Sequence, residues 1–445
     1  MKQIIQRLIY VVFGLSIAFH LKAQTRSLTL DAIFQAAASG NKTIQVKLLE
    51  KTLTESTTAE VKSMLLPQIF FTSSYTYFLE RPVIYLRDEN QLPKANPVKY
   101  NGSLALDASI NASYAITNPV AKAEIASTQI ETDKKVQESK LFCEELAFQL
   151  SRLFYNTIFL KHQESVLLQS LERNKKALFD AKNLYLEGKA LKTDTLNYMI
   201  DIQRLENGLS ALANQIHINL LQIKRLCAFD LEMPIQLEGD LAIDSDIVTY
   251  IKNKEARENL LNERADIKLA SLAIQSSQTD LKRYKSMYQP MLMSFAQYQV
   301  QSQADNFKLR AYTLPRTSLI GLKLQVPIYA GKRIQHQTSS AKLLSKKREL
   351  EKSELTDKAK AELSALTLRL SDEIKQWQTQ QKSITAAQEA YQIIYERYQA
   401  GLSNRIELSD AELALTKSKL EEKSYLFSIK ILETEIKKTL GKLNL

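Results

Sequence analysis

The distribution of proline strongly limits what this chain can fold into. Nine prolines occur in 445 residues, and none lies between Pro119 and Pro234 or after Pro327. Glycine is almost as scarce, with 10 residues, and both types fall well below their usual shares of about 5–7%. Because proline breaks helices and glycine weakens them, such long stretches without proline favour helices of unusual length.

Two very long helices are therefore predicted, at about 120–187 and 333–400. Within the first, apolar residues recur at spacings of three and four, as at Leu146, Leu150 and Leu153. This spacing indicates one buried stripe with polar flanks, as in coiled coils. At 1.5 Å per residue each helix would be about 100 Å long, whereas an ordinary helix has about 11–12 residues.

Each long helix reaches a glycine, Gly188 or Gly401, at which the chain is expected to reverse. A second helix follows each turn, at about 194–228 and about 404–440. The fold class predicted from these segments is mainly α, with two long antiparallel α-helical hairpins and a β contribution of four strands.

The four strands are predicted from apolar residues at every second position. The even positions from Leu104 to Ile116 are all apolar, whereas most odd positions between them are small or polar. Segments of about ten residues with one apolar and one small polar face are typical of strands that face lipid. An ordinary half-buried antiparallel sheet is the alternative interpretation. Strands with this alternation are predicted at about 67–80, 103–117, 290–302 and 317–328.

The first residues, 1–23, have the features of a cleaved signal peptide. Lys2 and Arg7 precede a mainly apolar run, Leu8–Phe19, and cleavage is expected after Ala23. The run is too short to span a bilayer. No later segment is apolar enough for a transmembrane helix, so a secreted chain of this kind is either soluble or enters a membrane as a β-barrel.

Charge and motifs argue against an enzyme. The formal net charge is +11, but lysines and glutamates are interleaved, as in 346–349, which indicates solvated helix faces and not a nucleic-acid surface. The histidines after the signal peptide, His162, His217 and His336, are isolated. Zinc-ligand spacing, a P-loop and a nucleophile elbow are all missing. We therefore expect no catalytic residues, no cofactor, no metal site and no nucleic-acid partner.

The sequence also repeats itself. The lysine, serine, methionine and proline of 62–67 recur at 285–290, and the tyrosine, glycine and acid of 185–194 recur at 398–407. Each half reads helix, strand, strand, long helix, glycine turn, helix. The predicted repeats are 24–232, which ends with a hairpin at about 120–228, and 233–445, which begins with a connecting segment and ends with a hairpin at about 333–440.

These motifs, in this order, resemble the TolC-like outer-membrane efflux protein family over essentially all of the chain after the signal peptide. Leu28–Ile33 is similar to the family's opening helix, and Val326–Arg333 to its junction between the last strand and the long helix. The prolines that the family often has near 41–42 and 264–266 are missing. The resemblance implies a homotrimer, with a trimeric twelve-stranded transmembrane β-barrel and a tapering α-helical tube.

The function implied by the resemblance is that of a duct in a tripartite efflux or secretion system, type I secretion included. Such a duct lies in the outer membrane of a Gram-negative bacterium, with its helical tube in the periplasm. It conducts substrates passively from a periplasmic adaptor (membrane fusion protein) and an inner-membrane pump of the RND or ABC type. Rearrangement of its helical tips opens it. The alternative is a secreted or cell-surface coiled-coil structural or adhesion protein.

The resemblance also implies a periplasmic gate. Asp194 and Tyr398 correspond to a gate-locking pair, and Glu407 and Asp410 to a ring of acids that narrows the pore. The acids are three residues apart, so they share one helix face. The family's basic gate residue corresponds to Ser403, so one gate contact is expected to be missing or replaced.

Each of these residues also has a simpler structural explanation. Asn404 and Glu407 have the spacing of a capping box, and an exposed polar helix face would explain Asp410. The resemblance makes Gly188 and Gly401 the adaptor-docking tips of the hairpins, whereas C-capping by a left-handed glycine would explain both without a partner.

Overall fold

The structure is a computed structural model, and the residues that it describes do not include the signal peptide predicted at 1–23. The described residues are 26–87, 98–99, 102–244, 263–305 and 313–445.

The chain divides into two compact units. Unit 1 comprises Met1–Leu48, Gln137–Leu269 and Lys352–Leu445. Unit 2 comprises Leu49–Val136 and Ala270–Glu351. Neither unit coincides with a predicted repeat, because each contains segments from both halves of the sequence. The division into repeats stays a prediction.

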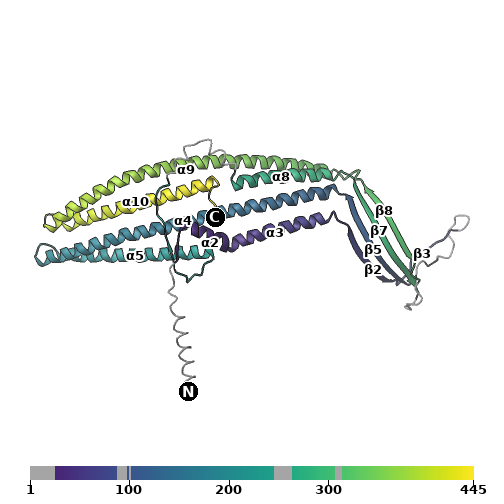
Figure 1. Cartoon of the computed structure of the whole chain (residues 1–445), viewed down its shortest axis with the longest axis horizontal. Coiled ribbons are helices and arrows are strands. Elements are labelled where there is room, and N and C mark those ends of the chain that lie inside the picture. Colours follow the sequence, from purple (N-terminus) through teal and green to yellow (C-terminus); the bar gives the residue numbers. More distant parts are fainter. Residues whose placement is uncertain (1–25, 88–97, 100–101, 245–262, 306–312) are drawn as a thin grey trace, which may run out of the picture. The chain divides into compact units, whose positions relative to one another are not determined.

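The two long helices are present. Helix α4 covers Pro119–Leu186 with 68 residues, and α9 covers Arg333–Gln399 with 67 residues. After a turn, α4 is followed by the antiparallel helix α5, Lys192–Cys227, and α9 by the antiparallel helix α10, Arg405–Thr439. In unit 1 these elements form the α4–α5 and α9–α10 hairpins (Figure 1). The predicted helical hairpins are thus confirmed.

A small structured region at the open ends of the hairpins was not predicted. Helix α2, Leu30–Gly40, lies beside a parallel pair of three-residue strands, β1 at Arg26–Leu28 and β6 at Ile235–Leu237. Leu28, Ile33 and further apolar residues of these elements pack with α4 and α5 in one core. Burial of apolar side chains therefore holds α2, β1 and β6 against α4 and α5 in unit 1.

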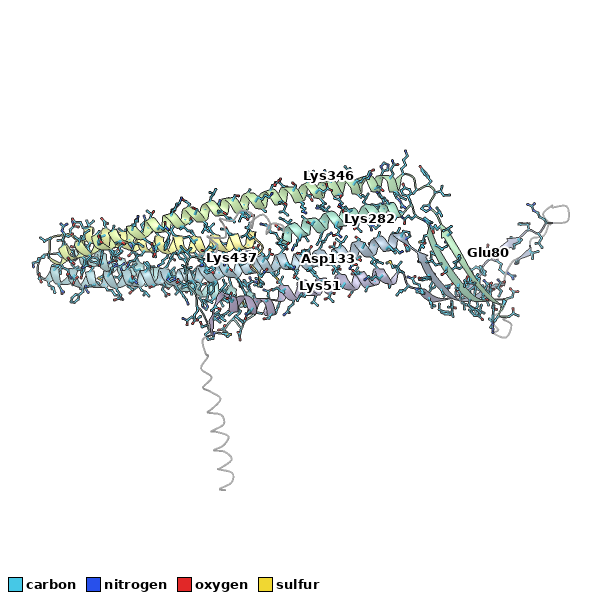
Figure 2. The ribbon with its side chains drawn as sticks, turned by 45° about the horizontal axis from the view of Figure 1, so that its top comes forward. Lys51, Glu80, Asp133, Lys282, Lys346 and Lys437 are labelled. Carbon is cyan, nitrogen blue, oxygen red and sulfur yellow. The ribbon has the colours of Figure 1, made fainter. Side chains whose placement is uncertain are left out.

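Unit 2 contains helix α3, Lys42–Ser63, and helix α8, Ala265–Ser286, over most of their lengths, together with parts of α4 and α9. Charged side chains project from all four helices, as Figure 2 shows at the labelled positions. The labelled residues of these helices are Lys51, Asp133, Lys282 and Lys346. The interleaved charges of the sequence thus cover solvated helix faces.

Unit 2 also contains a four-stranded antiparallel sheet in the order β2-β5-β7-β8. Strand β8 ends at Gln325, earlier than predicted, because the nearby Pro327 has no N–H with which to continue a ladder. A separate pair, β3 at Val83–Ile84 and β4 at Val98–Lys99, was not predicted. The sheet strands are β2 Gln68–Tyr77, β5 Leu104–Thr117, β7 Met291–Ala304 and β8 Arg316–Gln325.

The register places most apolar residues of the four strands on one face of this sheet. Phe71 pairs with Ile110, which pairs with Tyr298 on the next strand. Ala296 pairs with Ile320 in the same way. Residues paired across strands share a face, so the alternation predicted from sequence produces one continuous apolar surface. In the described chain, no helix combines the length and apolarity that crossing a membrane requires.

Candidate functional site

The tips of both hairpins turn at a glycine with a left-handed backbone. Gly188 has φ of 76° and Gly401 has φ of 75°. At the second tip, Leu402 N–H donates to the Arg397 carbonyl at 2.8 Å, and Gly401 N–H donates to the Tyr398 carbonyl at 3.0 Å. The first tip has the same two bonds. This is the Schellman arrangement, which explains why glycine stands at both positions.

Replacing either tip glycine should therefore cost stability through the backbone alone. A Cβ at Gly401 would meet no atom within 4 Å, so Gly401→Ala should destabilise by about 1 kcal/mol because of its positive φ. Gly208 lies inside α5, where a Cβ would make an ordinary 3.8 Å contact with Leu167. Gly208→Ala should instead stabilise by up to about 1 kcal/mol. Chemical denaturation of both variants checks these opposite signs.

Behind the turns, the two hairpins of one chain pack against each other through a tyrosine-rich core. The rings of Tyr391 and Tyr395 stack with centroids 5.9 Å apart. Residues of all four long helices contribute, so the core joins the α4–α5 hairpin to the α9–α10 hairpin. Its buried members are Ala177, Ala181, Tyr198, Tyr391, Tyr395, Tyr398, Leu408, Ala411 and Leu415.

Tyr198 of α5 and Tyr398 of α9 meet in this core with their hydroxyls buried. In the described chain neither hydroxyl makes a hydrogen bond of good geometry, and hydrogen bonding between the two phenols contributes to the pKa of each. Burial is the main cause that raises the pKa of both. Because the two buried hydroxyls have only each other as partners, this contact satisfies their hydrogen bonding less fully than water would.

Arg405, the first residue of α10, links the same two hairpins by charge. Its Nε lies 3.7 Å from Asp194 Oδ1, and its Nη1 lies 3.9 Å from Asp201 Oδ2, both on α5. The guanidinium also stands 5.8 Å from the centre of the Tyr198 ring. We call Asp194, Tyr198, Asp201, Tyr398 and Arg405 the tip lock.

The structure thus brings the predicted pair Asp194 and Tyr398 into one cluster without a hydrogen bond between them. Asp194 accepts from the Leu191 backbone N–H at 3.2 Å and pairs with Arg405. Its charge is among the causes, after burial, that raise the pKa of Tyr398. Arg405, two residues after Ser403, is the basic residue that pairs with Asp194 in the described chain. Their role as a gate stays a prediction.

Glu407 and Asp410 differ in their surroundings. The Glu407 N–H donates to Asn404 Oδ1 at 2.9 Å, and Asn404 Nδ2 donates to Glu407 Oε1 at 3.3 Å. The Ser403 hydroxyl also donates to the Glu407 carboxylate. Asn404 therefore caps the start of α10, and the Glu407 side chain holds Asn404 in place, whatever the role of Glu407 in a pore. Asp410 is exposed, without a hydrogen-bond or ion-pair partner in the described chain.

Two further links join the hairpins above the tip lock. The Tyr395 hydroxyl of α9 donates to Asp180 of α4 at 2.9 Å. Farther along, Glu412 of α10 accepts from Arg173 Nη2 of α4 at 2.9 Å and from the Ser170 hydroxyl at 2.7 Å. Sequence reasoning missed these residues and Arg405, because no local pattern tells which residues of different helices meet.

Solved structures with a similar fold were found among membrane channels. CusC, a protein studied for transmembrane channel formation, is 14% identical over 93% of this chain and 92% of its own, with a TM-score of 0.77. The outer membrane protein VceC of Vibrio cholerae is 14% identical over 93% and 96%, with a TM-score of 0.73. The MtrE outer membrane channel of Neisseria gonorrhoeae is 13% identical over 93% and 89%, with a TM-score of 0.72.

The chain has the TolC-like fold. The similarity extends over almost the full length of both partners in each comparison, so it includes the sheet strands as well as the helical hairpins. No protein-family model and no curated protein matches the sequence. At these identities the comparisons establish the TolC-like architecture, and the roles of individual residues have to be argued from the chain itself.

Proposed function

We propose that this chain is the outer-membrane duct of a tripartite efflux or secretion system in a Gram-negative bacterium. Three copies form a continuous passage, with a sheet region in the membrane and helical hairpins in the periplasm. The duct is passive and performs no chemistry. A periplasmic adaptor and an inner-membrane pump of the RND or ABC type deliver the substrate and supply the energy.

The observation that carries this proposal is the apolar face of the four-stranded sheet. Ile320 is 86% exposed and Leu322 is 68% exposed on this face, and Phe71 and Ile110 are exposed beside them. A contiguous exposed apolar surface of this kind marks an interface with a membrane or a protein. The other face carries mainly small and polar residues, although Phe70, Phe295 and Leu319 also lie on it, and the sheet thus has the two-sided character of a lipid-facing wall.

The two outermost strands, β2 and β8, give a reason for assembly. Each is paired on one side only within the sheet, and lipid cannot satisfy the remaining backbone groups. Because the four strands alternate in direction, β8 of one copy can pair antiparallel with β2 of the next. Three copies then close a twelve-stranded barrel without a free edge.

The hairpin tips supply a gate and a docking surface. The tip lock holds the two hairpins of each chain together, and Glu407 and Asp410 of three copies form an acidic constriction. Leu186 is 82% exposed and Leu402 is 71% exposed, each close to a tip glycine. These apolar side chains at the tips Gly188 and Gly401 are suited to an adaptor. Separation of the hairpins opens the duct.

Membrane extraction followed by electrical recording tests the proposal. The full chain should be recovered from outer membranes with detergent, as a trimer, and should conduct ions in a planar lipid bilayer. A water-soluble monomer without conductance would contradict the proposal and favour the secreted coiled-coil structural or adhesion protein. Membrane association without conductance would support the outer-membrane location but contradict the function as a duct.

A further inference from the structure

The face of the sheet opposite the apolar surface is almost free of charge. Four glutamines, Gln297, Gln299, Gln301 and Gln303, occupy alternate positions of β7 and therefore lie on this face. Neighbouring strands place hydroxyl and amide side chains beside them, and Phe70, Phe295 and Leu319 lie on the same face. Asn111 Nδ2, for example, donates to Ser109 Oγ at 3.0 Å. We call this surface the amide face.

The pairing register identifies the charged residues of the amide face. Among the described strands of the sheet it holds Asp107 on β5 and Lys323 on β8, and no other charged residue. Asp107 Oδ1 accepts from Gln299 Nε2 at 3.3 Å. Lys323 is exposed. Each chain thus contributes one acid and one base to this face, with no net charge.

The acid and the base lie at different levels of the sheet. Asp107 pairs with Gln301, whereas Lys323 pairs with Met293 on the same strand. The two levels are eight residues apart along β7, which is roughly 26 Å at 3.3 Å per residue. Charges in solution are screened over about 8–10 Å at physiological salt. Asp107 and Lys323 therefore act on a passing solute independently.

We propose that the amide face lines the membrane part of the duct as a passage of low charge, which admits hydrated polar solutes of either charge. Along the described strands, selection by charge is confined to the levels of Asp107 and Lys323. The inference rests on the proposed function, because it takes the amide face as the wall of the passage. Glutamine and serine side chains both donate and accept hydrogen bonds, so they replace hydration water for solutes of either sign.

Ion selectivity measured in planar bilayers, with a salt gradient across full-length trimers, tests this inference. Lys323→Gln should raise the permeability of potassium relative to chloride about twofold, since it removes three positive charges from one level of the wall. Asp107→Asn should lower this ratio by a similar factor. Gln297→Lys should also lower it, because Gln297 lies four residues along β7 from the level of Asp107 and four from that of Lys323, so the new charge stands at an otherwise neutral level.

Arg316 provides the matched control. It lies on the same strand as Lys323 and is also exposed, but it pairs with Val300 and so belongs to the apolar face. Arg316→Gln removes the same charge and should leave the permeability ratio unchanged. Equal shifts in the Lys323 and Arg316 variants, or no shift in any variant of a conducting trimer, would overturn the inference alone. A wild-type chain that does not conduct would overturn the proposed function itself.

Discussion

An Arg405→Ala variant is expected to pass more current than the wild-type chain, with the ratio of open to closed channels raised about tenfold. Arg405 connects the hairpins through Asp194 and Asp201, at 3.7 and 3.9 Å. A partly exposed ion pair contributes about 1 kcal/mol at most. Loss of both pairs therefore changes the free-energy difference between the open and closed states by roughly 1.4 kcal/mol. This corresponds to a tenfold change in their equilibrium constant.

Two features of the tip favour a large effect from so small a loss. The buried hydroxyls of Tyr198 and Tyr398 make no hydrogen bond of good geometry in the described chain and interact only with each other, whereas separation of the hairpins would expose them to water. Arg405 also lies over the Tyr198 ring, so its removal weakens the same contact. At the tip lock, the ion pairs of Arg405 are therefore the main polar contacts between the hairpins.

Arg204 offers a control that shares a partner with Arg405. Its Nη1 lies 3.5 Å from Asp201 Oδ1, three residues earlier on the same helix, so this pair does not connect the hairpins. Arg204→Ala removes the same type of side chain from the same carboxylate and should leave the conductance unchanged. Single-channel recording of both variants decides the matter. A similar increase in both variants would mean that a general loss of positive charge, and not the link between hairpins, controls opening.

The elements of this fold could be predicted from the sequence because their signals are local. The absence of proline after Pro119 and after Pro327 fixed the extents of α4 and α9 closely. The alternation of apolar and polar residues located the sheet strands. The pairing register then explained this alternation, because the register gathers most of the apolar residues on one face. The short strands β1 and β6 escaped prediction because three residues are too few to show a period.

The candidate site was only partly predictable, for a physical reason. The capping contacts of Glu407 lie within one helical turn, so the spacing from Asn404 indicated them. The ion pairs of Arg405 depend on how the two hairpins are rotated relative to each other. Asp194 and Arg405 are 211 positions apart in the sequence, and no local sequence pattern predicts that rotation.

An Arg173→Ala variant is expected to lose about 3 kcal/mol of stability, the largest stability effect predicted for this chain. Arg173 and Glu412 are only 17% and 14% exposed. Removing one partner of a buried pair leaves the other charge without compensation, which costs about 3–5 kcal/mol. The hydroxyls of Ser170 and Thr416 still donate to Glu412 at 2.7 Å each, which places the expected loss at the lower end.

Chemical denaturation of three variants separates this burial effect from the loss of a surface charge. Lys175 lies two residues farther along α4 and pairs with Glu172 at 3.4 Å, with both side chains well exposed. Lys175→Ala should therefore change the stability by less than about 0.5 kcal/mol. Combining Arg173→Met with Glu412→Leu removes both charges and should recover much of the loss, because no buried ion then remains unpaired. A double variant as unstable as Arg173→Ala would show that hydrogen bonding to Ser170 and Thr416, and not charge compensation, holds α4 against α10.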